Sequence, residues 1–243
     1  MVVAFSGGVD STLLLAVSRQ VLGTKVLAVT ASSLLYPAGE TVQARRICRR
    51  LGCRHIVIRS REMDLPQFRK NSRNRCFLCK WELFTDMLKV ASSLGYTVIE
   101  GANRSDRSDF RPGSKAARDL GIASPLDLAG LSKPEIRRLA KRMGLPNWDK
   151  PAMACLASRI PYGRRIDRAT LKRIAQAETY IRRHVADQVR VRDHFPICRI
   201  EVLATAFSRI IKRRKKIVQY FKRLGYTYVT LDMAGYKTGS MNL

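Results

Sequence analysis

Short apolar runs alternate with longer amphipathic stretches along the first 150 residues. Four runs are apolar and rich in β-branched residues, which is typical of buried strands, and they cover residues 2–5, 25–31, 55–59 and 97–100. Stretches with helical spacing that end just before a glycine predict helices from just after residue 11 to about 22, and at about 40–51 and 79–94. Strands that alternate with helices form parallel sheets with right-handed crossovers. The pattern therefore predicts an α/β domain built on a parallel sheet.

Two further features belong to this same unit. A polar loop rich in aspartate and arginine is expected at residues 101–113, directly after the fourth strand. Ser132 and Glu135 have the spacing of a capping box, with Pro134 in the first turn, and predict a helix that continues to Met143.

A loop punctuated by proline and glycine, residues 146–163, separates this unit from a basic remainder. The remainder predicts, in order, a helix at about 167–184, strands at 188–192 and 197–202, a basic helix at about 205–224 and a strand at 226–231. No period of about 20–50 residues recurs, which argues against a solenoid. We therefore expect two domains, a parallel-sheet domain over residues 1–150 and a smaller α+β domain over residues 151–243.

Composition narrows the class of protein. With 243 residues and 46% hydrophobic side chains, the chain suits a globular protein with a core and excludes disordered and fibrous classes. Its longest apolar runs, such as residues 13–17 and 26–29, are far shorter than the roughly 20 residues that span a bilayer, and no signal segment is apparent. We therefore expect a cytoplasmic protein without a membrane partner.

The net charge is high, at +27, from 46 lysines and arginines against 19 aspartates and glutamates. Residues 1–150 carry 26 basic and 13 acidic side chains, and residues 151–243 carry 20 and 6, so the shorter part is more basic per residue. A field of this sign attracts anions such as nucleotides, nucleic acids or acidic lipids. Charge alone does not distinguish between these partners.

A glycine turn between the first strand and the first helix contains Ser6, Gly7, Gly8, Asp10 and Ser11. In this position, the amides at the helix N-terminus and the positive end of the helix dipole can hold an anion. The glycines let the main chain approach phosphate oxygens, and the serine hydroxyls add donors. An aspartate fits among phosphate ligands when Mg²⁺ bridges its carboxylate to a pyrophosphate. The alternative is an ordinary glycine turn, which a Gly-Gly pair by itself would favour.

This turn resembles the SGGxDS loop of the PP-loop ATP pyrophosphatases, which holds the β- and γ-phosphates of ATP while the α-phosphate is attacked. The resemblance implies ATP-dependent adenylation with release of pyrophosphate. It also implies an adenine site at Ala31 and Ser32, at the end of the second strand, and a nucleotide-contacting loop that includes Gly101 and Asp106. The turn has no Walker Gly-Lys-Ser/Thr motif, which disfavours γ-phosphoryl transfer of the P-loop kind.

Cysteines supply a second candidate chemistry. Cys76 and Cys79 lie three residues apart near a predicted helix start, and Cys155 lies in the interdomain loop. Three thiolates can hold one metal centre and leave a fourth position vacant, so an iron–sulfur cluster there could take up an extra sulfide and deliver it to an activated carbon. Structural zinc would need a fourth ligand, and the three histidines show no ligand spacing to these cysteines. A CxxC redox pair is the competing interpretation.

The other three cysteines are expected to be buried thiols, and they are Cys48, Cys53 and Cys198. A reducing cytosol does not maintain structural disulfides. The six cysteines together are therefore not interpreted as a disulfide framework.

Three segments indicate which family of PP-loop enzymes the chain resembles. They are the CxxC region at residues 75–80, the run at 109–113 and the loop at 151–163. Over essentially its whole length the chain resembles the LarE family of ATP-dependent sulfur transferases. The family acts on pyridinium-3,5-biscarboxylic acid mononucleotide in nickel-pincer nucleotide biosynthesis, with sulfur from a sacrificial cysteine or from a [4Fe–4S] cluster held by three cysteines. Ala154 takes the place of the sacrificial cysteine here. The resemblance therefore implies the cluster type, with Cys76, Cys79 and Cys155 as the ligands.

The predicted strand after residue 187 alternates so that Arg190 and Arg192 share one side and two valines share the other. Two guanidinium groups on one face suit a phosphate or carboxylate, although a solvated outer sheet face has the same pattern. The resemblance favours a functional role, because the matching arginines of the family bind the substrate's phosphate, and Glu178 is the matching glutamate. Ser158 and Arg159 are expected beside the same pocket.

The last predicted helix carries five consecutive basic residues, at positions 212–216. Such a run is typical of a solvated helix face. If the run has a partner, nucleic acid is the obvious candidate, although this role is not favoured here.

We therefore expect an enzyme that adenylates a carboxylate of the pyridinium mononucleotide, expels pyrophosphate and replaces AMP with sulfur, using ATP, Mg²⁺ and a [4Fe–4S] cluster. A carboxylate is a poor electrophile, and adenylation gives its carbon a good leaving group. One alternative is a PP-loop enzyme that thiolates tRNA, which the net charge suggests. Another is an inactive nucleotide-binding module with a structural metal. A homo-oligomer is expected, and the sulfur donor that recharges the cluster does not follow from the sequence.

Overall fold

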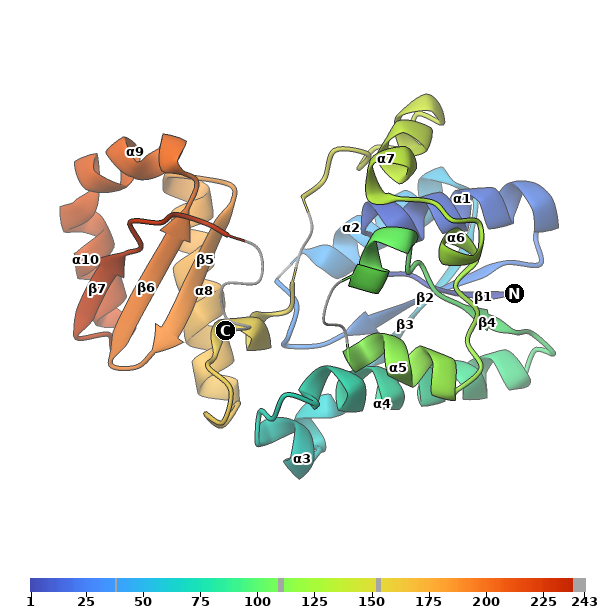
Figure 1. Cartoon of the computed structure of the whole chain (residues 1–243), viewed down its shortest axis with the longest axis horizontal. Coiled ribbons are helices and arrows are strands. Elements are labelled where there is room, and N and C mark those ends of the chain that lie inside the picture. The colour runs from blue at the N-terminus through green and yellow to red at the C-terminus, as the bar shows by residue number, and fades with distance from the viewer. Residues whose placement is uncertain (38, 109–111, 152–153, 238–243) are drawn as a thin grey trace. The chain divides into compact units, whose positions relative to one another are not determined.

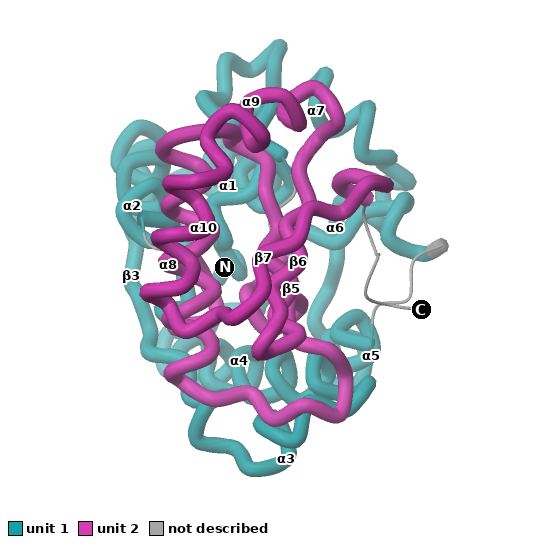
Figure 2. Tube along the Cα trace, turned by 90° about the vertical axis from the view of Figure 1, so that its left-hand side faces the viewer, with its two compact units in different colours: residues 1–33, 38–153 teal, residues 34–37, 154–243 magenta. Residues whose placement is uncertain are grey.

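The computed structural model describes residues 1–37, 39–108, 112–151 and 154–237 (Figure 1). The chain divides into two compact units, residues 1–33 with 38–153 and residues 34–37 with 154–243 (Figure 2). In the described ranges, no helix is both long enough and apolar enough to cross a membrane. Parts of two motifs that carry the family resemblance, residues 109–111 and 152–153, lie outside the described residues.

The first unit is built on a four-stranded parallel sheet with the order β3-β2-β1-β4. Its strands are β1 (Val2–Ala4), β2 (Leu27–Ser32), β3 (Arg54–Arg59) and β4 (Val98–Ile99). In β1, Val3 lies opposite Ala28 of β2 on one side and Ile99 of β4 on the other. This arrangement confirms the predicted α/β class, and it puts the carboxyl ends of the strands at one edge, where open α/β sheets bind ligands.

Helices cover both faces of this sheet (Figure 1). They are α1 (Val9–Leu22), α2 (Glu40–Arg50), α3 (Pro66–Arg69), α4 (Arg75–Ser92), α5 (Pro112–Asp119), α6 (Pro125–Leu128) and α7 (Lys133–Arg142), with 3₁₀ turns η1 (Glu62–Asp64) and η2 (Arg104–Ser108). Because neighbouring side chains of a strand point to opposite faces, Val3 packs with residues of α1, α2 and α7, and Val2 packs with residues of α4 and α5. The sheet is therefore buried on both faces, as parallel sheets are.

The second unit has a mixed three-stranded sheet with the order β5-β6-β7. Its elements are η3 (Leu156–Arg159), α8 (Arg168–His184), β5 (Val189–His194), β6 (Ile197–Val202), η4 (Ala204–Ala206), α9 (Phe207–Lys212), α10 (Arg214–Arg223) and β7 (Tyr228–Leu231). β6 pairs antiparallel with β5 and parallel with β7. Val189 and Val191 of β5 pack with Ile181 of α8 and Phe221 of α10 in a separate core. The opposite face of β5 is left to Arg190 and Arg192.

The structure differs from the sequence prediction at several elements. The single basic helix predicted over residues 205–224 is wrong, because α9 and α10 meet at Arg213, whose φ and ψ are −98° and 5°. Arg213 lies within the five consecutive cations, and like charges one turn apart destabilise a continuous helix. Helices α3, α5 and α6 were not predicted, although each begins with a proline, which is common in a first helical turn; the prolines are Pro66, Pro112 and Pro125.

A four-residue segment of the amino-terminal half completes the second unit. Residues 34–37, which follow β2 in the sequence, belong to this unit rather than to the first. Leu35 is only 1% exposed, and its carbonyl accepts a hydrogen bond from the Leu156 amide at 2.7 Å. The second unit is therefore not a continuous stretch of sequence, which the predicted division at residues 150 and 151 did not anticipate.

Candidate functional site

The predicted phosphate-binding turn, residues 6–11, joins β1 to α1 and is closed by its own serines. Gly7 has a φ of +72°, which residues with a side chain rarely adopt. The Ser6 hydroxyl accepts a hydrogen bond from the Gly8 amide at 3.3 Å, and the Ser11 hydroxyl donates to the Gly8 carbonyl at 3.1 Å. Gly8 is the N-cap of α1 and has no side chain to cap the helix. The first amides of α1 and the positive end of its dipole are therefore available to an anion.

Asp10 is contacted by two residues from distant parts of the sequence. Its carboxylate forms an ion pair with Nζ of Lys133, at the start of α7, and accepts a hydrogen bond from Nδ2 of Asn103 at 3.5 Å. The side chains of Asp10 and Lys133 are 22% and 29% exposed. A half-buried carboxylate beside the anion-binding turn has the oxygen ligands that Mg²⁺ prefers.

Sequence reasoning missed Lys133, and it included Asn103 only as one residue of the loop expected to contact the nucleotide. Lys133 does leave a signal in the sequence, because the helix dipole disfavours a cation in the first turn of a helix that a capping box opens. The ion pair with Asp10 compensates this unfavourable position. Asn103 lies in the loop expected to contact the nucleotide, but nothing in its local pattern distinguishes it from neighbouring polar residues.

Gly101 and Asp106 shape the loop that presents Asn103. A Cβ atom on Gly101 would lie 3.0 Å from the backbone N of Ser11 and 3.2 Å from its Cα, so a side chain there would press on the N-terminus of α1, whereas glycine fits without displacing it. Asp106 accepts a hydrogen bond from the Asn103 amide at 3.1 Å. The structure thus places Gly101 against the predicted phosphate-binding turn. Asp106 instead stabilises the fold of its own loop through this hydrogen bond.

Asn147 is a further residue of this site that sequence reasoning missed. It is 2% exposed, and its Nδ2 donates to the Gly7 carbonyl at 3.0 Å and to the Thr12 hydroxyl at 2.9 Å. Among the residues that the structure describes, its Oδ1 has no hydrogen-bond partner. Asn147 therefore fixes the turn glycine to the first helix from a position far away in the sequence.

Asn147→Leu is expected to lower the free energy of unfolding by about 1–3 kcal/mol, because it leaves the buried Gly7 carbonyl without its donor. The freed turn is also expected to weaken binding of the anion that the turn is predicted to hold, for which ATP is the probe. Urea denaturation and calorimetric titration with ATP measure the two effects. Gln67→Leu, which replaces an amide at an exposed position of α3, is the matched control and should change stability by less than about 0.5 kcal/mol. Equal effects of the two substitutions would contradict the assigned role.

The predicted adenine residues lie at the carboxyl edge of the same sheet. Ala31 and Ser32 end β2, and Ser32 is exposed there. The carboxylate of Glu62 is 1% exposed and accepts hydrogen bonds from the hydroxyls of Ser33 and Ser60, which follow β2 and β3. Glu62 therefore links the ends of the two strands through hydrogen bonds and stabilises this edge of the sheet.

Cys76 and Cys79 lie at the start of α4, and both are half-buried. Residues three apart share one face of a helix, so their sulfur atoms can ligate a common centre. Cys155 belongs to the second unit and directly precedes η3. In the described part of the chain, no group of three or more His, Cys, Asp or Glu residues is arranged to hold a metal ion. The three-cysteine centre therefore remains a prediction.

The remaining cysteines differ in burial. Cys48 is 1% exposed and Cys198 is fully buried, which confirms the expectation for these two, and burial raises the pKa of each thiol to about 12. Cys53 is half-buried, and burial raises its pKa as well. These shifts suppress the reactive thiolate form.

Cys48 and Cys198 are expected to resist alkylation by iodoacetamide at pH 8 in the native protein. With a pKa of about 12, the thiolate fraction at that pH is on the order of 10⁻⁴, and burial also excludes the reagent. Mass spectrometry of peptides from treated protein measures the modification. The same thiols should react readily in urea, which serves as the control, and rapid native modification of Cys198 would contradict the prediction.

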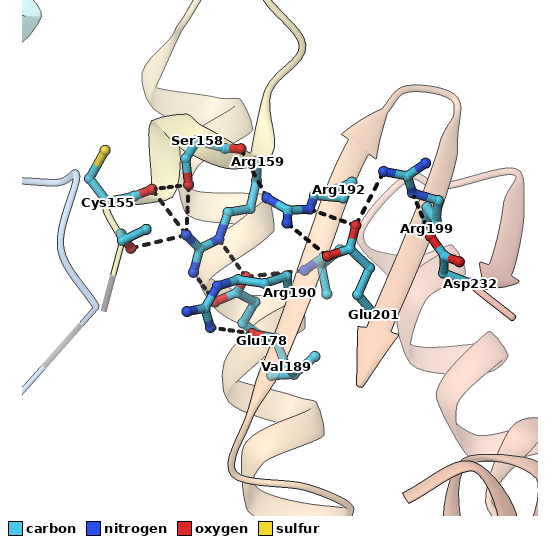
Figure 3. A network of polar contacts seen from close by, with 12 residues as sticks. Cys155, Ser158, Arg159, Glu178, Val189, Arg190, Arg192, Arg199, Glu201 and Asp232 are labelled. Carbon is cyan, nitrogen blue, oxygen red and sulfur yellow. Dashed lines mark hydrogen bonds and ion pairs between the residues drawn. The ribbon is translucent and has the colours of Figure 1, made fainter. Parts of the chain in front are cut away.

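Arg159 connects the segment around Cys155 to α8 (Figure 3). It is 1% exposed and donates two hydrogen bonds to the carboxylate of Glu178, at 2.7 and 3.1 Å. Its Nη1 also donates to the carbonyls of Ala154 and Cys155 and to the Ser158 hydroxyl. A single buried guanidinium group thus fixes the backbone on both sides of the Cys155 side chain.

Arg192 forms the second buried pair of this network, with Glu201 of the neighbouring strand (Figure 3). The two side chains are 5% and 0% exposed and share hydrogen bonds of 2.9 and 2.7 Å. Arg192 also donates to the Ser158 carbonyl at 3.1 Å, and Arg199 contacts Glu201 at 3.2 Å. Sequence reasoning missed Glu201, although strand alternation and the hairpin register place it directly opposite Arg190.

Arg190 lies beside these pairs. Its Nη1 donates to the Val189 carbonyl at 2.8 Å, and its guanidinium group lies 5.1 Å from the centre of the Tyr236 ring. Burial and the nearby charge of Arg159 lower the pKa of Arg190. Arg190 and Arg192 share a face, as predicted, and each is only 5% exposed, so this face is not a solvated outer surface.

Three arginines and two carboxylates lie together in this buried network: Arg159, Arg190 and Arg192 with Glu178 and Glu201. Each carboxylate is also contacted by an outer arginine, Arg182 or Arg199. Guanidinium groups match the geometry of phosphate and carboxylate oxygens through paired N–H donors. The arrangement therefore suits a phosphate or carboxylate ligand.

Each unit thus contains one cluster of predicted site residues. The first unit gathers the anion-binding turn, Gly101 and the two residues that contact Asp10. The second unit gathers Ser158, Arg159, Glu178, Arg190 and Arg192 into one network. The cysteines are divided, with Cys76 and Cys79 in the first unit and Cys155 in the second.

Comparison with known proteins finds full-length relatives. The chain is 41% identical over 99% of its length to an uncharacterized protein of Synechocystis sp., of which it covers 91%. It is 33% identical over 99% of its length to the pyridinium-3,5-bisthiocarboxylic acid mononucleotide synthase of Lactiplantibacillus plantarum, of which it covers 88%. It is also 27% identical to an uncharacterized protein of Methanocaldococcus jannaschii, over 98% of the chain and 91% of that protein.

Other similarities are partial. The tRNA-specific 2-thiouridylase MnmA of Rhizobium johnstonii is 32% identical over 60% of the chain, and the match covers 46% of that protein. No protein-family model matches the chain. The full-length similarity to the mononucleotide synthase therefore outweighs the partial similarity to the tRNA enzyme.

Proposed function

The chain belongs to the LarE family of pyridinium-3,5-bisthiocarboxylic acid mononucleotide synthases, and from this membership we propose that it converts carboxylates of pyridinium-3,5-biscarboxylic acid mononucleotide into thiocarboxylates at the expense of ATP. It is an enzyme and a sulfurtransferase of the PP-loop class. The observation that carries the ATP-dependent step is the anion-binding turn at the start of α1, with Asp10 paired to Lys133 beside it.

The first step activates the carboxylate. A carboxylate oxygen of the substrate attacks the α-phosphorus of ATP, the bond from that phosphorus to the pyrophosphate oxygen breaks, and an acyl-adenylate forms. The amides of the turn would hold the pyrophosphate oxygens, and Lys133 would add a positive charge as the leaving group develops negative charge. Asp10 has the carboxylate oxygens to hold Mg²⁺, which neutralises pyrophosphate charge when bound.

The second unit would hold the substrate's phosphate. Arg190 and Arg192 share a buried face, and Glu178 and Glu201 fix the direction of the guanidinium groups of Arg159 and Arg192. Guanidinium groups match the geometry of phosphate oxygens through paired N–H donors. Binding the phosphate there would orient the pyridinium ring without contact to its reacting carboxylates.

We assign the supply of the transferred sulfur to a centre held by three cysteines. Cys76, Cys79 and Cys155 are the residues that would hold a [4Fe–4S] cluster, and such a cluster supplies a transferable sulfide when bound. The half-buried positions of the three thiols and the helical spacing of the first two fit this role. Arg159 positions the backbone of Cys155, and Ala154 stands where a sacrificial cysteine would be needed.

Substrate-dependent formation of AMP tests the proposed function. Protein purified anaerobically is incubated with ATP, Mg²⁺, the mononucleotide and sulfide, and AMP, pyrophosphate and the thiolated product are quantified by liquid chromatography and mass spectrometry. AMP is expected only when the mononucleotide is present. ATP binding without any AMP would contradict the proposal and support an inactive nucleotide-binding module. Sulfur incorporation into bulk tRNA instead of the mononucleotide would support the tRNA enzyme.

Asp10→Asn is expected to lower substrate-dependent AMP formation by on the order of 10²-fold, because it removes the carboxylate charge that Mg²⁺ requires and leaves Lys133 without its partner. The rate of AMP release measures the effect. Asp119→Asn, at an exposed position at the end of α5, is the matched control and should retain the full rate. An unchanged rate for Asp10→Asn would exclude the assigned role of Asp10.

A further inference from the structure

The second unit carries a strongly basic surface that the proposed function does not use. Between Glu201 and Asp232 the chain has eight lysines and arginines and no acidic residue. We call these eight exposed residues the basic helix pair, and they are Arg209, Lys212, Arg213, Arg214, Lys215, Lys216, Lys222 and Arg223. They lie on α9 and α10 and at the junction between these helices.

Packing holds the two helices in place and leaves their cations in solvent. Ile210 of α9 and Ile217 and Phe221 of α10 are at most 5% exposed and belong to the core of the second unit. A helix that inserts into a lipid surface needs its apolar face for the membrane. Here the core occupies that face, so the basic helix pair does not fit insertion into a membrane.

The basic helix pair lacks counter-charges among the described residues, where none of its members takes part in an ion pair. Arg214 donates to the Ile211 carbonyl at 3.3 Å. Exposed arginines elsewhere in the chain, such as Arg61 and Arg107, do pair with acidic side chains. Three of the eight cations also lie in the first turn of α10, where the helix dipole disfavours positive charge by about 0.3–1 kcal/mol each. The concentration of charge therefore destabilises the fold locally, and a polyanion would relieve it.

An aromatic pair adjoins these cations. Tyr220 of α10 stacks on Tyr180 of α8, with ring centres 4.1 Å apart and planes 12° apart, and both side chains are half-buried. Lys216 and Arg223 lie one helical turn from Tyr220, and Arg183 lies one turn from Tyr180. The surface therefore combines unpaired cations with aromatic rings from two helices.

We propose that the basic helix pair, together with Tyr180 and Tyr220, binds single-stranded nucleic acid. Cations bind the phosphates of a single strand, and aromatic rings stack on bases whose faces a duplex would cover. Cations one turn apart on a helix lie about 5–6 Å from each other, close enough to contact successive phosphates. A single strand uses both features, because its phosphates contact the cations and its bases stack on the rings. This inference is independent of the proposed sulfur transfer.

The test measures binding of a fluorescein-labelled oligouridylate of about 20 nucleotides by fluorescence anisotropy at several salt concentrations. The variant replaces Lys212, Arg213, Lys215 and Lys216 with glutamine. Its matched control replaces four exposed arginines of α2 with glutamine, removing the same charge elsewhere, at Arg45, Arg46, Arg49 and Arg50. The variant is expected to bind at least about tenfold more weakly, and its salt slope should fall by up to about 3, because each phosphate contact contributes about 0.7. The control should change affinity by less than about threefold.

Tyr220→Leu separates the rings from the charges. It is expected to weaken binding about three- to tenfold with an unchanged salt slope, because stacking does not release counterions. Circular dichroism checks that the variant is folded. An unchanged affinity in the folded variant would overturn the role of the aromatic pair.

Three results would overturn the proposal as a whole. Equal weakening in the α9–α10 variant and the α2 control would show that only the net charge attracts the oligonucleotide. Tighter binding of a duplex of the same length would exclude a single strand as the preferred ligand. Loss of binding to phosphatidylserine vesicles without any effect on the oligonucleotide would assign the surface to lipid. Substrate-dependent AMP formation is measured in the same variants and should stay unchanged, which keeps this test separate from that of the proposed function.

Discussion

Replacement of Cys76, Cys79 or Cys155 by alanine is expected to abolish sulfur transfer and to remove the brown colour of the anaerobically purified protein. Three thiolates are the ligands that the proposed cluster requires, and two thiolates do not retain a [4Fe–4S] cluster with a free iron position. Charge-transfer absorption and iron content measure the loss independently of activity. All three single substitutions should give the same spectrum, although their residues come from two units.

Cys53→Ala is the control for these substitutions, because Cys53 is also a half-buried thiol but lies outside the proposed centre. It should retain colour, iron and activity. The three variants should also retain ATP binding, since the anion-binding turn contains none of these cysteines. Retained iron in Cys155→Ala would contradict a three-cysteine centre. A wild-type protein that becomes lighter by the mass of H₂S during turnover would show that a cysteine is sacrificed instead.

Glu201→Ala is expected to lower the free energy of unfolding of the protein by about 3–5 kcal/mol. The substitution leaves Arg192, only 5% exposed, without the carboxylate that accepts two of its hydrogen bonds. It also removes a partner of Arg199. Urea denaturation followed by circular dichroism measures the free energy of unfolding.

Glu82→Ala is the matched control, because Glu82 pairs with Arg61 at the surface, where the arginine side chain is 53% exposed. Such a pair contributes about 0–1 kcal/mol. The double substitution Glu201→Gln with Arg192→Met should recover much of the lost stability, because no buried charge then lacks a partner. A loss below about 1 kcal/mol for Glu201→Ala would show that water or another side chain replaces the carboxylate.

Local patterns predicted the strand, the glycine turn and the helix at the start of the chain. The order of strand, glycine turn and helix is encoded by neighbouring residues, because Gly7 needs its positive φ and Gly8 needs to leave the helix N-terminus open. The position of the arginines and the valines of β5 on opposite faces likewise follows from strand geometry, because successive side chains of a strand point to opposite sides. The break at Arg213 was missed because the apolar spacing of the two short helices continues across it.

The side chains that contact the predicted residues could not be predicted from local sequence patterns. Lys133 and Asn103 reach Asp10 from 123 and 93 residues away, and no periodicity links positions so far apart. Burial of Arg190 and Arg192 also depends on tertiary packing, since an exposed outer face would show the same alternation. The segment at residues 34–37 joins the second unit through contacts that its own sequence does not indicate.

The sequence by itself determined the α/β class, the glycine turn between the first strand and the first helix, the family and the cysteine pattern, because these depend on residue types at short spacings and on similarity along the whole chain. The tertiary structure alone decided which side chains surround Asp10, that Glu178 and Glu201 hold the buried arginines, and that the cations of α9 and α10 stay in solvent. The physical reason is that backbone periodicity is set by sequence neighbours, whereas ion pairs and burial are set by how distant elements pack.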